Sequence, residues 1–258
     1  MISLTSAEIN AWIVAFFFPL ARILALLVTA PPFNNDGLST QVRLLLGLAI
    51  AMAVVPALPP IPAMDPASGP GLLILAQQMI IGIAMGFSLR LVFSAIDMAG
   101  TMISNQMGLG FATAYDPQSA SQTSVISEFL GMLALLTFMS ISGHLMVIAT
   151  LVQSFSALPI GGVLENGSWQ NIANAGGLIF SSGVLLSLPI VVALLITNIA
   201  LGVLGRVAPQ LNLMAIGFPI TIVLGFAALA VSMSYLSSPL QQLFEFGLRS
   251  MMGYFVIK

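Results

Sequence analysis

Long apolar runs separated by short polar turns dominate the chain. A helix needs about 20 residues, at about 1.5 Å each, to cross a bilayer core of about 30 Å. By this measure the pattern predicts long apolar helices over residues 9–30, 72–95, 125–154, 178–204 and 213–236. A further run starts near Val42, but Pro56 interrupts it and more prolines follow, so we expect it to be too short to span alone. The predicted fold class is all-α, built from membrane-associated helical hairpins.

Prolines inside the last two runs predict bent or broken helices. Pro189 lies within 178–204 and Pro219 within 213–236, and an internal proline removes a backbone donor and clashes with the preceding turn. The tail, residues 239–258, sets Leu, Phe and Met at helical spacing among polar and charged residues. This spacing predicts an amphipathic helix lying on a membrane or on a partner. No repeat or linker divides the chain, so we predict one domain over residues 1–258.

Composition narrows the class of protein. Apolar residues make up 59% and charged residues 5% of the chain, against about 25% charged in a typical soluble domain, which excludes an ordinary water-soluble globule. Six Lys and Arg residues and a net charge of −2 leave too little positive charge to bind nucleic acid. With no cysteine, one histidine and no nucleotide-binding or hydrolase motif, we predict no metal, no cofactor and no enzymatic activity.

The charges are too few to set a topology. If the runs alternate across a membrane, the basic residues divide almost evenly between its two sides, so the positive-inside rule gives no orientation. The N-terminal run is longer than a signal peptide and carries no basic residue near its start, so we expect it to be retained. We expect some of these helices to face protein instead of lipid.

Residues 97–127 form the most polar long stretch and hold our candidate functional residues. Small residues spaced four apart let helices approach closely, and here they are Gly82 and Gly86, then Gly100, Ser104 and Gly108. We call each of these two sets of small residues a seam, and helix packing within the chain alone would explain either one. The flexible side chains of Met98, Met102 and Met107 could form a soft seal, although filling an irregular core is the explanation we favour from the residues alone.

Ionisable residues inside apolar runs usually point to function in a membrane protein. The candidates for buried polar or ionisable groups are Arg22, Arg90, Asp97, Glu128, His144 and Arg206. Arg90 and Asp97 are about two turns apart and share a helix face. A proton pathway would need these groups in a chain, which the spacing does not require. We therefore favour a hydrogen-bonded structural role for His144.

The residues from Ala99 to Gly110, AGTMISNQMGLG, followed by Asp116-Pro117, resemble the central signature of the FliR family of flagellar type III export components. Two further blocks resemble the same family, namely Gly143-His144 with Ser154-Phe155 and Pro159, and Arg206 to Asn212 with Gly217. The likeness covers essentially the whole chain. One departure is Ser142, where family members often have Asn, and the second His that often accompanies this block is missing.

The resemblance implies a non-enzymatic subunit of an export gate in the bacterial inner membrane, at the flagellar basal body. It implies assembly with FliP-like, FliQ-like and FlhB-like subunits inside a basal-body ring protein, around a channel for unfolded flagellar proteins. The resemblance also implies a central loop that helps to plug the channel. The plug residues carried over to this chain are Gln106, Met107, Gly108, Leu109, Gly110, Phe111, Asp116 and Pro117. Asp116 and Pro117 also resemble a helix N-cap and first turn, which is a structural role.

Two alternatives stay open at this point. A small secondary transporter or permease would also show broken apolar helices with internal charges. The equivalent subunit of a virulence injectisome would share the export mechanism, although the Gln106-Met107-Gly108 form of the signature favours flagella.

Overall fold

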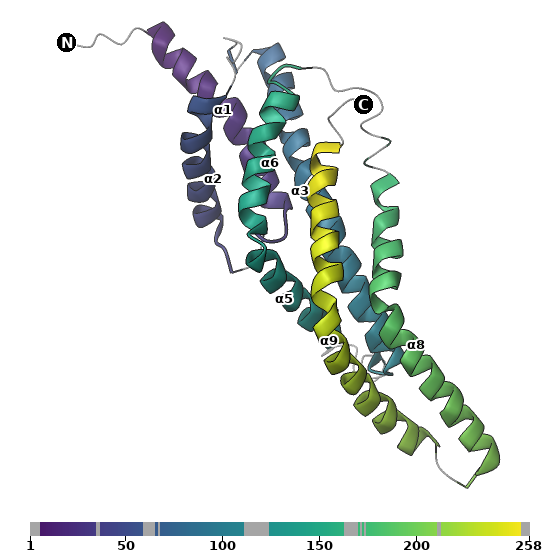
Figure 1. The fold of residues 1–258 in the computed structure, drawn as a ribbon. Coiled ribbons are helices and arrows are strands. Elements are labelled where there is room, and N and C mark those ends of the chain that lie inside the picture. The colour runs from purple at the N-terminus through teal and green to yellow at the C-terminus, as the bar shows by residue number, and fades with distance from the viewer. Residues whose placement is uncertain are drawn as a thin grey trace. The chain divides into compact units, whose positions relative to one another are not determined.

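The computed structural model describes residues 6–34, 37–58, 65–66, 68–110, 124–162, 170, 172, 174–210 and 213–253, and within them it contains helices and no strand. The helices are α1 (Ser6–Thr29), α2 (Thr40–Val54), η1 (Val55–Ala57), α3 (Gly69–Gln106), α5 (Val125–Ser140), α6 (Gly143–Ala157), α8 (Gly177–Val207) and α9 (Leu213–Gly253) (Figure 1). Four are long and apolar enough to cross a membrane, or up to five if the bent pair α5 and α6 is one span. The predicted fold class is confirmed.

Contacts within the chain gather in two compact units, which are described separately. The first unit draws on Met1–Leu91, Ser142–Ala175 and Glu245–Lys258, and the second on Val92–Ile141 and Gly176–Phe244. Both α3 and α9 therefore contribute residues to each unit. That residues 1–258 act as one domain stays a prediction.

In the first unit, apolar side chains at helical spacing bury one face of each helix. On α3 the buried residues Ile81, Met85 and Leu89 lie four apart, as expected for one stripe of an amphipathic helix. The corresponding buried residues are Phe18, Ile23, Leu26 and Leu27 on α1 and Val147, Leu151 and Phe155 on α6.

In the second unit, the rings of Phe93, Phe138 and Phe244 meet with centroids 5.2 to 6.3 Å apart, a spacing favourable for aromatic pairs.

The run that begins near Val42 is longer than we predicted. Ser39 caps α2 by accepting a hydrogen bond from the Val42 backbone. The η1 helix then carries the helical run through Pro56, which gives an 18-residue segment, Thr40–Ala57, with a mean hydropathy of 1.7. Pro56 occupies an early position in η1, where the missing N–H of proline costs no hydrogen bond. By length and composition this segment is a candidate span, so the expectation that it is too short is wrong.

The single helix predicted over 125–154 is broken. The α5 helix ends at Ser140 and α6 begins at Gly143, with Ser142 between them in the left-handed conformation, at φ 56° and ψ 33°. An L-residue in this conformation interrupts the right-handed helix. Serine and glycine are both weak helix formers, so the Ser140-Ile-Ser142-Gly143 sequence contained the signal for this break.

The last two helices run through their prolines. Pro189 lies inside α8, and Pro219 and Pro239 lie inside α9, and α8 changes direction part-way along its length in Figure 1. The tail is therefore the end of α9 and not a separate helix. Its predicted amphipathic pattern is present, with Leu240, Phe244, Leu248 and Met251 buried and with Gln241, Gln242, Glu245 and Arg249 exposed. That apolar face is buried within the chain, and contact of the tail with a membrane or a partner stays a prediction.

The left-handed Ser142 gives a testable prediction. Replacing Ser142 with Gly should raise the free energy of unfolding by about 1 kcal/mol, because glycine adopts a positive φ without steric cost. Replacing it with Val should lower the same quantity, since a β-branched residue tolerates this conformation poorly. Thermal unfolding of the detergent-solubilised protein measures both variants. Equal stability of Gly and Val at this exposed position would contradict the assigned conformation.

Candidate functional site

The α3 helix ends inside the predicted plug segment, and Gly108 ends it. Gly108 has φ 83°. Its N–H donates to the Asn105 carbonyl at 3.0 Å, and the N–H of Leu109 donates to the Ser104 carbonyl, also at 3.0 Å. This pair of hydrogen bonds around a left-handed glycine is the Schellman ending of a helix. Gly108 therefore lies just beyond the last turn of α3, where it ends the helix in a defined left-handed conformation.

Met107, directly before that glycine, is wholly buried against α9. The Thr221 hydroxyl donates to the Met107 carbonyl at 3.1 Å. A Cβ placed on Gly225 would lie 2.8 Å from both Sδ and Cε of Met107, so the methionine lies directly on the glycine. Gly217, Thr221 and Gly225 are four apart along α9, which gives that helix a face of small residues. We did not predict this face from the sequence, although its i, i+4 spacing was the signal.

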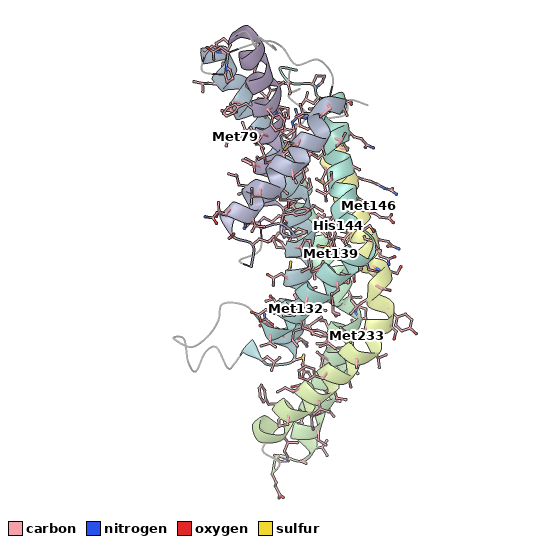
Figure 2. The ribbon with its side chains drawn as sticks, turned by 90° about the vertical axis from the view of Figure 1, so that its left-hand side faces the viewer. Met79, Met132, Met139, His144, Met146 and Met233 are labelled. Atoms are coloured by element: carbon pink, nitrogen blue, oxygen red, sulfur yellow. The ribbon has the colours of Figure 1, made fainter. Side chains whose placement is uncertain are left out.

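The other two methionines of the predicted seal pack against α8. A Cβ added to Gly183 of α8 would lie 3.2 Å from both Cβ and Cγ of Met98. The sulfur of Met102 accepts a hydrogen bond from the Ser187 hydroxyl, also on α8, at 3.7 Å. All three methionines therefore fill space between helices of the second unit, as in the core-filling explanation that the residues alone favoured. Among the described residues, six other methionines are exposed by at least 40%, and these are Met52, Met79, Met132, Met139, Met146 and Met233. Figure 2 labels the last five.

The predicted small-residue seams lie at close helix contacts. Gly82 faces the Arg22 carbonyl and Ala25 of α1, and a Cβ on Gly86 would lie 2.7 Å from Thr29 Cβ. Gly100 faces the backbone of Ser127 in α5. Ser127 also donates its hydroxyl to the Asp97 carbonyl at 3.0 Å. The buried Ser104 supplies the carbonyl that accepts the α3 capping bond.

Arg22 is a fully buried cation whose hydrogen-bond acceptors are all neutral. Its Nε donates to Gln78 Oε1 at 2.8 Å. Its two terminal nitrogens donate to Ser154 Oγ and to the Leu158 carbonyl, each at 3.0 Å. The guanidinium also lies over the Phe155 ring, 4.2 Å from the centroid. A buried charge normally needs a compensating partner.

The C-terminus of α6 provides that compensation. Leu158 is the C-cap of α6, and the last carbonyls of a helix carry partial negative charge. The guanidinium therefore caps α6 while it joins α1 to α3. Gln77, next to Gln78 on α3, donates to the Gly162 carbonyl in the turn that follows α6. Arg22 stands out in the sequence as a charge inside an apolar run, but its partners cannot be recognised there because they come from distant parts of the chain.

The remaining ionisable candidates differ from the expectation of burial. Arg90, Asp97, Glu128 and Arg206 are exposed in the chain, because the helix faces that carry them are not covered. His144 is half-buried, and its Nδ1 finds no hydrogen-bond partner within the described part of the chain.

The described residues hold no group of three His, Asp or Glu side chains that could bind a metal. Phe111, Asp116 and Pro117 lie outside the described residues.

Comparison with known proteins decides the family. A family model described as "Bacterial export proteins, family 1" matches residues 13–247. The chain is 41% identical over 246 residues to flagellar biosynthetic protein FliR of Pectobacterium carotovorum subsp. carotovorum, across 95% of this chain and 94% of that protein. It is 40% identical over 248 residues to FliR of Escherichia coli K12, with the same two shares. The chain belongs to the FliR family of bacterial export proteins.

FliR-family membership settles the class of function. The chain is a FliR homologue of the flagellar biosynthesis machinery, and the family is non-enzymatic, as the sequence predicted. The likeness extends to a more distant FliR from Bacillus subtilis strain 168, which is 26% identical over 241 residues, across 92% of this chain and 93% of that protein. Membership in an export family removes the support for a secondary transporter, and these named relatives favour the flagellar over the injectisome alternative.

The close approach at Gly82 gives a matched pair of variants. Gly82→Ala should lower the free energy of unfolding by about 1–3 kcal/mol, because the new Cβ would overlap the Arg22 carbonyl and Ala25. Gly131 lies in α5, where an added Cβ would meet no atom within 4 Å, so Gly131→Ala should be neutral or stabilising by up to about 1 kcal/mol. Thermal unfolding of the solubilised protein compares the two. Equal effects would contradict the close packing of α3 on α1.

The Arg22 cluster gives a second prediction. Arg22→Ala should lower the free energy of unfolding by about 2–4 kcal/mol, because it leaves several buried acceptors without donors. Arg22→Lys should recover only part of the loss, since an ammonium lacks the planar fork that reaches all three acceptors. The control is Arg249→Ala, which removes a 3.6 Å surface ion pair with Glu245 and should have little effect. An Arg22→Ala protein as stable as the Arg249 variant would refute the capping role.

Proposed function

We propose that this chain is a subunit of the flagellar type III export gate, and that residues 106–116 plug a channel for unfolded flagellar proteins. It assembles with FliP-like, FliQ-like and FlhB-like subunits within a basal-body ring protein in the bacterial inner membrane. The observation that carries the proposal is the ending of α3. Met107 is buried on α9 and Gly108 turns the chain sharply, so the segment that follows starts from a fixed point.

Exposed apolar surface supports assembly. On α8 the side chains of Leu185, Ile196 and Val203 are 70%, 63% and 59% exposed, and α9 exposes residues such as Val231 and Tyr235. Apolar patches of this extent mark membrane or protein contacts. Together with the spanning helices, they fit a membrane protein whose helices are covered partly by lipid and partly by sister subunits.

The proposed gating is passive and makes no chemical bond. Leu109 and Phe111 supply apolar side chains that exclude water and ions from a narrow pore. Gly110 allows the chain to pass close to α3, since a Cβ there would lie 2.9 Å from Asn105 Oδ1. An entering polypeptide displaces the segment. The energy for export comes from outside this chain, because its sequence holds no nucleotide-binding motif.

Replacing residues 109–116 with a Gly/Ser linker of equal length tests the plug. The replacement keeps Met107 and Gly108, so the end of α3 is preserved. We expect the resting ion leak of cells or vesicles that carry the assembled complex to rise by at least severalfold, because the apolar barrier is gone. Copurification with the FliP-like and FliQ-like subunits confirms assembly. An unchanged leak in a fully assembled complex would refute the plug.

A further inference from the structure

We infer that Thr221 and Gly225 of α9 are positioning residues of the gate, forming a seat that holds Met107 while the channel is closed. This inference rests on the proposed plug function and identifies the contact that keeps the plug in place. We call the face of Thr221 and Gly225 the Met107 seat. On opening, the displaced plug segment draws Met107 out of this seat.

The seat holds both the backbone and the side chain of Met107. The Thr221 hydroxyl donates to the Met107 carbonyl at 3.1 Å and lies 3.0 Å from the carbonyl of Phe218, on its own helix. The Met107 side chain lies over Gly225, where a Cβ would come within 2.5 Å of Met107 Cγ. Met107 is 0% exposed and Thr221 is 7% exposed. The contact is therefore closed to solvent.

The position of Met107 in the chain connects the seat to the plug. Met107 directly precedes Gly108, whose left-handed conformation turns the chain out of α3. Leu109 follows within the same hydrogen-bonded turn, so a movement of Met107 is transmitted to the start of the plug segment. Methionine suits a reversible contact, because an unbranched and polarizable side chain can leave and re-enter a site without an exact fit.

Only glycine at position 225 leaves room for the Met107 side chain in the seat. A methyl group there would overlap Met107 at Cγ, Sδ and Cε, and the flexible side chain would have to move away. Gly217 provides a control on the same helix, because a Cβ there would meet only Leu201 Cδ1, at the ordinary distance of 3.8 Å. Gly225→Ala and Gly217→Ala make the same chemical change and the same gain in helix propensity.

The first arm of the test compares these two variants in the assembled complex. Gly225→Ala should raise the resting ion leak by at least severalfold, because Met107 is displaced and the plug is held less firmly. Gly217→Ala should leave the leak at the parent level. Copurification of partner subunits and thermal unfolding report assembly and stability separately. Equal leak in the two variants would overturn the inference.

The second arm locks the seat. The chain has no cysteine, so the double variant Met107→Cys with Gly225→Cys can form one disulfide only. Copper phenanthroline should form it in the assembled complex, and export of a flagellar substrate should fall at least tenfold, then return with dithiothreitol. Each single-cysteine variant should export equally with and without oxidant. Normal export by the oxidised protein, or no disulfide at all, would overturn the inference.

The two proposals fail differently. If replacing residues 109–116 leaves the leak unchanged, the plug itself is refuted. If that replacement raises the leak while Gly225→Ala behaves as Gly217→Ala and the locked protein exports normally, the plug stands and the seat is refuted.

Discussion

The ending of α3 depends on one left-handed glycine. Its conformation lets the N–H groups of Gly108 and Leu109 donate to two of the last carbonyls of a 38-residue helix. Met107, directly before Gly108, is buried on the small-residue face of α9. A residue with a Cβ would be strained at this φ. The point at which the proposed plug segment begins therefore follows from backbone geometry.

The same requirement to satisfy buried polar groups explains the first unit. Arg22 lies where no carboxylate reaches it in the described residues, and the C-terminal carbonyls of α6, a glutamine and a serine supply its acceptors. In a membrane environment an unsatisfied polar group costs more than in water, so the cluster ties α1, α3 and α6 together. Close contacts at Gly82 and Gly86 supplement it, because glycine lets the α3 backbone approach α1.

Sequence periodicity was sufficient for the fold class, and residue signatures were sufficient for the family. The long apolar helices, the prolines inside them and Arg22 as a candidate buried group could be predicted, because each depends on local composition. The break at Ser142, the continuation of α3 to Gln106 and the packing of Met107 on α9 were not predicted. Ser142-Gly143 and the spacing of Gly217, Thr221 and Gly225 carried signals for the first and the last, but the φ of Ser142 and the contact of Met107 with a distant segment are seen only in the structure. Gly108 shows the difference most clearly. Its i+4 spacing fitted a packing seam, whereas its φ made it the residue that ends the helix.

An experimental structure of this chain assembled with its FliP-like and FliQ-like subunits in the closed state tests the central claim most directly. We predict that residues 109–116 lie across the channel, with Met107 buried against Gly225 at the end of α3. A closed channel sealed by other residues, with this segment lying away from the pore, would contradict the claim.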